Sequence, residues 1–225
     1  MNRPKTARLL NDLMSRSKDL LENHPVNLAR KSAGKEPANS IWPWSPGYKP
    51  AMKSLKELFG IQKGAVISAV DLIQGIGVYA GLDVIKVEGA TGLYNTNYEG
   101  KAEAAVKALA DHDFVYLHVE ASDEAGHEGD LDLKIRTIEY LDQRVLKYLM
   151  ESCSKMSEPV TIALLPDHPT PWKLRTHTRE AVPFVIYCPG ETPDSVDHYD
   201  EAAAKLGSYG ELKGPQFMQM LLKLI

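Results

Sequence analysis

The chain has 225 residues, which is enough for one large domain or two small ones with a substantial core. Hydrophobic residues make up 44% and charged residues 25%, as in ordinary globular proteins. The 26 lysine and arginine residues against 30 aspartate and glutamate residues argue against a nucleic-acid binder. There is no apolar run of the roughly 18–20 residues that cross a bilayer. With only two cysteines, we expect a cytoplasmic protein without disulfides or membrane contact.

The first 53 residues predict one helix and an irregular connection. Leucines at helical spacing indicate a helix from Pro4 to Glu22, and His24-Pro25 ends that pattern. Residues 25–53 contain five prolines, so we expect no helix there, although 39–44 are candidates for extended structure. Three aromatic residues of this segment are either caps on the core, which we favour, or exposed anchors for a partner: Trp42, Trp44 and Tyr48.

From residue 54 onward, short apolar runs alternate with helical patterns. Strands are predicted at 65–70, 84–87, 114–119, 160–165 and 182–188. Helices are predicted at 54–59, 71–80 with Asp71 as N-cap, 98–110, 131–150 and 215–224. This order predicts an α/β fold, a mainly parallel sheet with helices on both faces. We therefore divide the chain into an N-terminal helix with its Pro-rich connection (1–53) and an α/β domain (54–225).

Polar residues of metal-ligand type follow or precede three of these strands. Asp123 and His127 follow the third strand, Asp167 and His168 follow the fourth, and His177 precedes the fifth. In parallel sheets chemistry gathers beyond the carboxyl ends of the strands. Each pair alone is weak, because a loop aspartate or histidine is usually solvated or caps a turn. Together they favour a site for Zn²⁺, Mn²⁺ or Fe²⁺.

The spacing within the two pairs differs. A helical turn would place Asp123 and His127 on one side, four residues apart. Asp167 and His168 are adjacent between prolines, where the backbone can direct them toward two neighbouring ions. His118 lies inside the third predicted strand among apolar residues, so we interpret it as a hydrogen-bonded core histidine.

Several longer stretches resemble the alkaline phosphatase superfamily and, more narrowly, the archaeal type of 2,3-bisphosphoglycerate-independent phosphoglycerate mutases. The matching stretches extend from about residue 20 to 187 and include KGAVISAVDLIQGIG (63–77), VEASDEAGHEGD (119–130), LLPDHPTP (164–171) and LRTHTREAVPF (174–184). The resemblance implies an alkaline-phosphatase-like α/β domain and a metal-dependent isomerase of glycolysis. Such an enzyme transfers phosphate between the two hydroxyls of a phosphoglycerate through a phosphoserine.

The resemblance also implies roles for individual residues. Asp123, His127 and His177 would hold one divalent ion, and Asp167 and His168 would help to hold a second, with Mn²⁺, Zn²⁺ or a similar ion at each. Lys101 is a candidate phosphate-contacting cation, although we favour a solvated helix residue at this position.

One departure from the family pattern is clear. In the superfamily, an aspartate near the chain start and the nucleophilic serine complete the second metal site, and we find neither here. Ser68 falls within a buried type of strand, where a hydroxyl bonded to the backbone explains it. The chain therefore resembles the carboxyl-terminal part of a mutase, and we expect it to lack full activity alone.

Two alternatives stay open. The chain is either another phosphatase or phosphotransferase of the superfamily, or a non-catalytic metal-binding domain that docks onto an amino-terminal half or partner chain.

Overall fold

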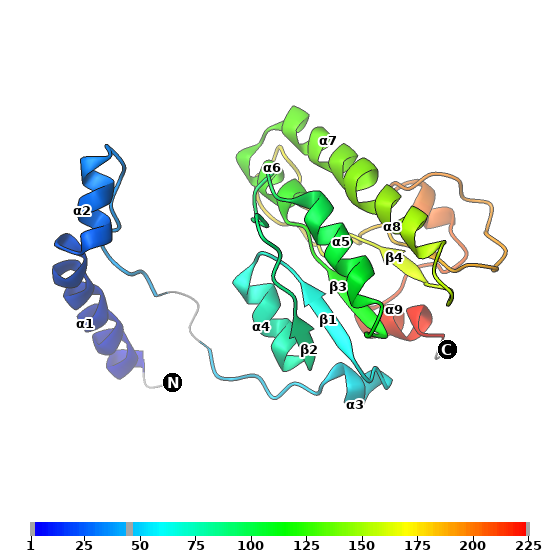
Figure 1. Ribbon diagram of the computed structural model, residues 1–225, viewed down its shortest axis with the longest axis horizontal. Coiled ribbons are helices and arrows are strands. Elements are labelled where there is room, and N and C mark those ends of the chain that lie inside the picture. The colour runs from blue at the N-terminus through cyan, green and yellow to red at the C-terminus, as the bar shows by residue number, and fades with distance from the viewer. Residues whose placement is uncertain (1–2, 44–46, 224–225) are drawn as a thin grey trace. The chain divides into compact units, whose positions relative to one another are not determined.

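The computed structural model describes residues 3–43 and 47–223. Residue contacts divide the chain into two compact units, Met1–Ala51 and Met52–Ile225 (Figure 1). Of the three aromatic residues singled out above, Trp44 lies outside the described residues. Trp42 and Tyr48 are 81% and 79% exposed, so the expectation that they cap a core is wrong.

The first unit is a pair of helices, α1 (Arg3–Glu22) and α2 (Pro25–Ser32). Asn27 is buried, and its amide donates to the carbonyls of Leu21 and Ala38 while its side-chain oxygen accepts from the Ala38 N–H. The extended segment after α2 is thereby fixed against the helix pair. The prediction of a connection without helices was wrong for 25–32, because Pro25 occupies the first helical turn, where it is tolerated.

The second unit is built on a three-stranded parallel sheet of order β2-β1-β3. Its strands are β1 (Gly64–Ile67), β2 (Leu82–Val84) and β3 (Phe114–Leu117). A separate antiparallel pair follows, β4 (Ile162–Leu164) with β5 (Val185–Tyr187). The parallel prediction therefore holds for the first three strands and fails for the last two.

Helices cover both faces of the three-stranded sheet, as its apolar strands require (Figure 1). On one face Val66 and Leu82 pack in a cluster beside α4 (Asp71–Tyr79), where Gly77 lets helix and strand approach closely. On the other face Leu117 packs against Tyr98 and Ala102 of α5 (Tyr98–Ala108). Alternate residues of one strand point to opposite faces, which explains the two clusters.

One long helical arm runs beside α5. It comprises α7 (Leu131–Tyr140), a π-helical stretch η1 (Leu141–Leu146) and α8 (Lys147–Cys153). The predicted helix at 131–150 is therefore present with a π-helical interruption. The remaining helices are α3 (Leu55–Phe59), α6 (Ala121–Glu128), the 3₁₀ turn η2 (Ala203–Leu206) and α9 (Gly214–Leu221).

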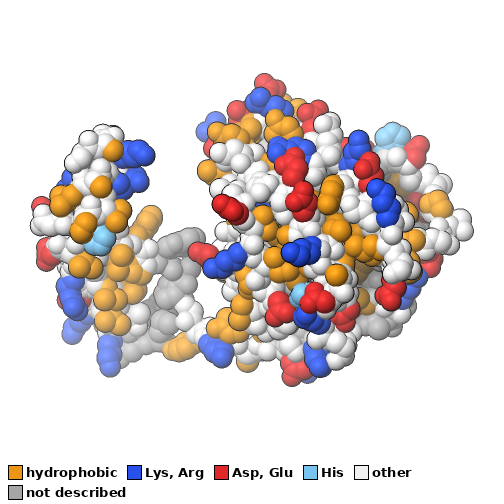
Figure 2. Space-filling view, viewed as in Figure 1, with side chains coloured by type: hydrophobic (Ala, Val, Ile, Leu, Met, Phe, Trp, Pro, Cys, Tyr) orange, Lys and Arg blue, Asp and Glu red, His pale blue; other side chains and the backbone are white. Residues whose placement is uncertain are grey.

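Two local predictions need correction. Val70, not Asp71, is the N-cap of α4, and Asp71 lies in the first turn, where its carboxylate favours the helix dipole. The strand predicted at 84–87 lies earlier, because Leu82 pairs with Gly64 in the sheet. Every helix in the described part of the chain is too short or too polar to span a bilayer. Figure 2 shows hydrophobic side chains interspersed with charged ones at the surface of both units.

Candidate metal centre

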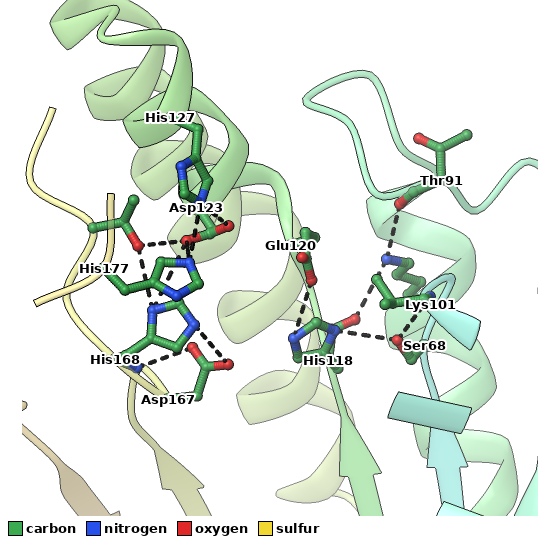
Figure 3. A network of polar contacts seen from close by, with 12 residues as sticks. Ser68, Thr91, Lys101, His118, Glu120, Asp123, His127, Asp167, His168 and His177 are labelled. Carbon is green, nitrogen blue, oxygen red and sulfur yellow. Dashed lines mark hydrogen bonds and ion pairs between the residues drawn. The ribbon is translucent and has the colours of Figure 1, made fainter. Parts of the chain in front are cut away.

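Asp123 and His127 lie on α6, the helix that follows β3. Their spacing of four residues places both side chains on one side, with Asp123 Oδ2 3.3 Å from His127 Nε2 (Figure 3). The helix ends at Glu128, and the residue that caps it, Gly129, has a φ of 72° in the left-handed region that glycine tolerates. Because a helix is rigid, these two groups are held in place by local structure.

His177 reaches the same point from the segment between β4 and β5. Its Nε2 lies 3.0 Å from His127 Nε2 and 3.4 Å from Asp123 Oδ1. Three ligand atoms of a tetrahedral zinc ion, each about 2.0–2.1 Å from the metal, are about 3.3 Å apart. The Nε2 atoms of His127 and His177 are 3.0 Å apart, and they lie 3.3 Å from Asp123 Oδ2 and 3.4 Å from Asp123 Oδ1, respectively. One ligand atom from each of the three residues lies within 4.8 Å of the other two. The donor set and its spacing therefore fit a divalent ion.

The orientation of the His127 ring is set by a backbone group. His127 Nδ1 lies 3.0 Å from the carbonyl oxygen of Arg175, to which it donates when it carries the proton. That tautomer leaves the Nε2 lone pair free for a metal. Arg175 has a φ of 55°, an uncommon value for a residue with a side chain. This residue, with its left-handed backbone, thus presents its carbonyl to His127, a predicted ligand.

Asp167 and His168 lie just after β4, beside the first three residues. The His168 N–H donates to Asp167 Oδ1 at 3.0 Å, and its Nε2 lies 3.5 Å from Asp167 Oδ2. The His168 and His177 rings lie against each other at a tilt of 32°, with centroids 3.7 Å apart. Among the described residues, Asp167 and His168 form no compact three-residue ligand set. All five predicted ligands lie together, but a second ion would need further donors.

Three acidic side chains form a second cluster that sequence reasoning missed. Glu120, Asp123 and Glu124 bring carboxylate oxygens within 4.8 Å of one another. Burial raises the pKa of Glu120, and the charges of Asp123, Asp167 and Glu124 raise it further. The signal was present in the run of acids after β3, but only the aspartate and the histidine had the spacing of a ligand pair.

Lys101 is buried, so the expectation of a solvated helix residue was wrong: its exposed fraction is 1%. Its Nζ donates to the carbonyls of Thr91 and His118, each at 3.4 Å (Figure 3). Burial lowers its pKa, against the raising effect of the Glu120 charge. The cation therefore lies beside the acidic cluster without an ion-pair partner within 4 Å among the residues that the structure describes.

Ser68, His118 and Glu120 form a short polar network near Lys101 (Figure 3). Ser68 Oγ lies 3.1 Å from His118 Nδ1, and His118 Nε2 lies 3.3 Å from Glu120 Oε2. The Ser68 hydroxyl also accepts the Val70 N–H at 3.0 Å. Burial lowers the pKa of His118, against the raising effect of the Asp167 and Asp123 charges. Ser68 and His118 are thus hydrogen-bonded interior residues, as their sequence context predicted.

Comparisons with known proteins identify the family of the chain. The model of the metalloenzyme superfamily matches residues 16–224, and the chain belongs to that superfamily. The chain is 50% identical over 223 residues to the 2,3-bisphosphoglycerate-independent phosphoglycerate mutase of Methanosarcina acetivorans. This match covers 99% of the chain and 56% of the relative, so the chain spans about half the length of the curated relatives it matches.

Solved structures give the same picture. A protein from Pyrococcus horikoshii superimposes with a TM-score of 0.83 at 34% identity, covering 97% of this chain and 57% of that one. The cofactor-independent phosphoglycerate mutase of Thermoplasma acidophilum superimposes with a TM-score of 0.58 at 28% identity, covering 98% and 52%. The α/β fold and the resemblance to this group of mutases are therefore confirmed, and the phosphatase alternative is not favoured.

Proposed function

We propose that this chain forms the metal-binding part of a phosphoglycerate mutase that interconverts 3-phosphoglycerate and 2-phosphoglycerate in the cytoplasm. One observation carries the proposal: Asp123, His127 and His177 converge at metal-ligand spacing. They do so in a chain that is 50% identical over 223 residues to a named phosphoglycerate mutase.

The expected ligands divide into two groups. Asp123, His127 and His177 hold the first divalent ion, Mn²⁺ or Zn²⁺. Asp167 and His168 contribute to a second ion, whose other ligands come from outside this chain. A divalent ion held there would polarise the phosphoryl oxygens and neutralise their charge.

The chain's own residues act around the ions. The Arg175 carbonyl keeps the His127 ring turned toward the centre. Lys101 supplies a positive charge for the phosphoryl group from a buried position, where its Nζ contacts the Thr91 carbonyl. Ser68 is 5% exposed and fully hydrogen-bonded, so we assign the nucleophile to a serine of the mutase outside this chain.

The edges of the two sheets offer places where the rest of the mutase could pair. In the part of the chain that the structure describes, β3 pairs only with β1, and β4 pairs only with β5. Unpaired strand edges accept a further strand. We therefore propose that the rest of the mutase, in the same chain or a second one, completes the site.

Metal content tests the metal centre. The full chain is dialysed against Mn²⁺, freed of unbound ion and measured by elemental analysis. We expect at least one bound equivalent, its loss in His177→Ala, and its retention in His198→Ala, a change at an exposed loop histidine. Absence of bound metal from the unaltered chain would remove the main support for the proposal.

Complementation tests the reaction. The chain is mixed with the remaining part of the Methanosarcina acetivorans mutase, and 3-phosphoglycerate conversion is followed by ³¹P NMR. We expect turnover from the mixture and none from either part alone. Stable association without turnover would instead support a docking domain, and phosphate release from a generic phosphoester would support a phosphatase.

A further inference from the structure

Lys134, in the first turns of α7, ties two ligand-bearing segments together. Its Nζ donates to the carbonyl of Ser122 on α6 and to the carbonyl of Thr170 on the segment after β4, each at 3.0 Å. Ser122 directly precedes Asp123 in the chain. The Lys134 ammonium group therefore joins the backbone beside the predicted ligand Asp123 to Thr170, which lies 36 residues after Lys134 in the chain.

Thr170 carries this link to the ligands themselves. Its side chain is buried, its hydroxyl donates a short hydrogen bond to Asp123 Oδ1, and its Oγ1 lies 3.3 Å from His168 Nδ1. Thr170 thus contacts one residue from each predicted ligand group. A hydroxyl that donates to one carboxylate oxygen fixes the direction of both oxygens. The other oxygen, Asp123 Oδ2, is the one that faces His127.

The close approach of the Thr170 backbone to α6 depends on the glycine at position 126. A Cβ at Gly126 would lie 2.5 Å from the Thr170 carbonyl oxygen and 3.1 Å from Lys134 Nζ. Only glycine lets the Thr170 backbone come this near to α6. The lysine is partly buried, and burial lowers its pKa while the charges of Asp123 and Glu201 raise it. An interior cation is costly unless it is hydrogen-bonded, as this one is.

We propose that Lys134 is a positioning residue of the metal centre, which acts through Thr170 to hold the Asp123 carboxylate in its ligating orientation. The inference rests on the proposed metal site. Outer contacts of this kind fix ligand geometry, and their loss weakens metal binding by about 10–100-fold.

The test uses Mn²⁺ binding to the full chain, followed by the electron paramagnetic resonance signal of free Mn²⁺. Lys134→Met should weaken binding about 10–100-fold. The matched control is Lys147→Met, at an exposed lysine on the same helical arm, and should bind as the unaltered chain does. Thr170→Val should also weaken binding, whereas Thr170→Ser keeps the hydroxyl and should restore it to within a few-fold.

The double variant separates positioning from a general loss of stability. If Lys134 acts through Thr170, then Lys134→Met in the Thr170→Val background should add little further loss of affinity. Additive losses would overturn the route through Thr170. If Lys134→Met fails to fold, as judged by circular dichroism, Thr170→Val decides, and affinity equal to that of the unaltered chain overturns the inference.

Failure of the metal centre is recognised separately. No Mn²⁺ uptake by the unaltered chain overturns both proposals. Normal uptake by the unaltered chain and by Lys134→Met overturns only the positioning role. Cobalt-loaded protein gives a second readout, because a displaced carboxylate changes the visible absorption of the ion while an intact geometry leaves it unchanged.

Discussion

Replacement of Lys101 by methionine tests whether the buried ammonium group opposes folding. The side chain is 1% exposed, and its two hydrogen bonds of 3.4 Å to carbonyl groups are long. Methionine has a similar volume and no charge. Replacing buried ionic groups by well-packed apolar ones is often neutral or stabilising, by about 1–4 kcal/mol. We expect Lys101→Met at pH 7 to unfold at the same or a higher urea concentration than the unaltered protein.

The pH dependence gives the sharper measurement. Burial lowers the pKa of Lys101 in the folded state, whereas the unfolded lysine titrates near 10.5. At pH values below the folded pKa, both states are protonated and the whole desolvation cost is present. Between the two pKa values only the unfolded state holds the proton, so the stability of the unaltered protein rises with pH, by at most about 1.4 kcal/mol per pH unit.

Urea unfolding at pH 7 and pH 10 measures both effects. The advantage of Lys101→Met at pH 7 should shrink toward pH 10. Lys107→Met, at an exposed lysine of the same helix, should stay within about 0.5 kcal/mol of the unaltered protein at both pH values. A methionine variant that is less stable by more than about 1 kcal/mol at pH 7 would show that the two carbonyl contacts outweigh desolvation, and the reasoning would be refuted.

Three substitutions in the second unit test the packing of α4 and the ion pairs of His112. Gly75→Ala should stabilise α4 by about 0.5–1 kcal/mol, since nothing lies within 4 Å of the new Cβ. Gly77→Ala should destabilise by about 1–3 kcal/mol, since its Cβ would lie 2.5 Å from a side-chain atom of β1; equal thermal shifts would contradict this packing. For His112, burial lowers the pKa, but hydrogen bonds to a backbone carbonyl, Asp111 and Asp83 outweigh it and raise the pKa. The raised pKa means that protonated His112 stabilises the fold below pH 6.5, and that this stabilisation is lost as the pH rises. His112→Gln should therefore lower the free energy of unfolding more at pH 5.5 than at pH 8.5. The difference should be less than about 1 kcal/mol, because the ion pairs of His112 lie near the protein surface. Urea midpoints that fall equally at both pH values would exclude this linkage.

The sequence predicted the architecture where hydrophobic pattern alone decides it. The apolar run that became β1 is fully buried, and the one that became β3 is half-buried except at Tyr116; their continuity predicted parallel neighbours. The same kind of run at β4 and β5 pairs antiparallel, because the pattern of a strand does not encode the direction of its neighbour. Proline content was misleading at Pro25, where a helix begins rather than ends.

The candidate ligands were predictable for a different reason. Asp123 and His127 follow a strand of the parallel sheet, where the strand-end rule applies. Asp167, His168 and His177 flank the antiparallel strands β4 and β5, to which the rule does not apply, and only their residue types pointed to the site. The structure brings all five together. The outer contacts were not predictable. The contacts of Thr170 and Lys134 join segments that are far apart in the chain, which a sequence pattern does not show. Lys101 looked solvated because an Ala-rich helix does not reveal which of its faces is buried.

The two parts of the first ligand group are held by different means, and this shapes how the site forms. Asp123 and His127 are fixed by one helix, and the Asp123 side chain is 19% exposed. His177 comes from an irregular segment, and its side chain is 50% exposed. That segment is connected back to β4 through the hydrogen bond from the Thr178 N–H to the Pro169 carbonyl at 3.1 Å. The predicted ligand set therefore depends on local helix geometry for Asp123 and His127, and on contacts between segments distant in the chain for His177.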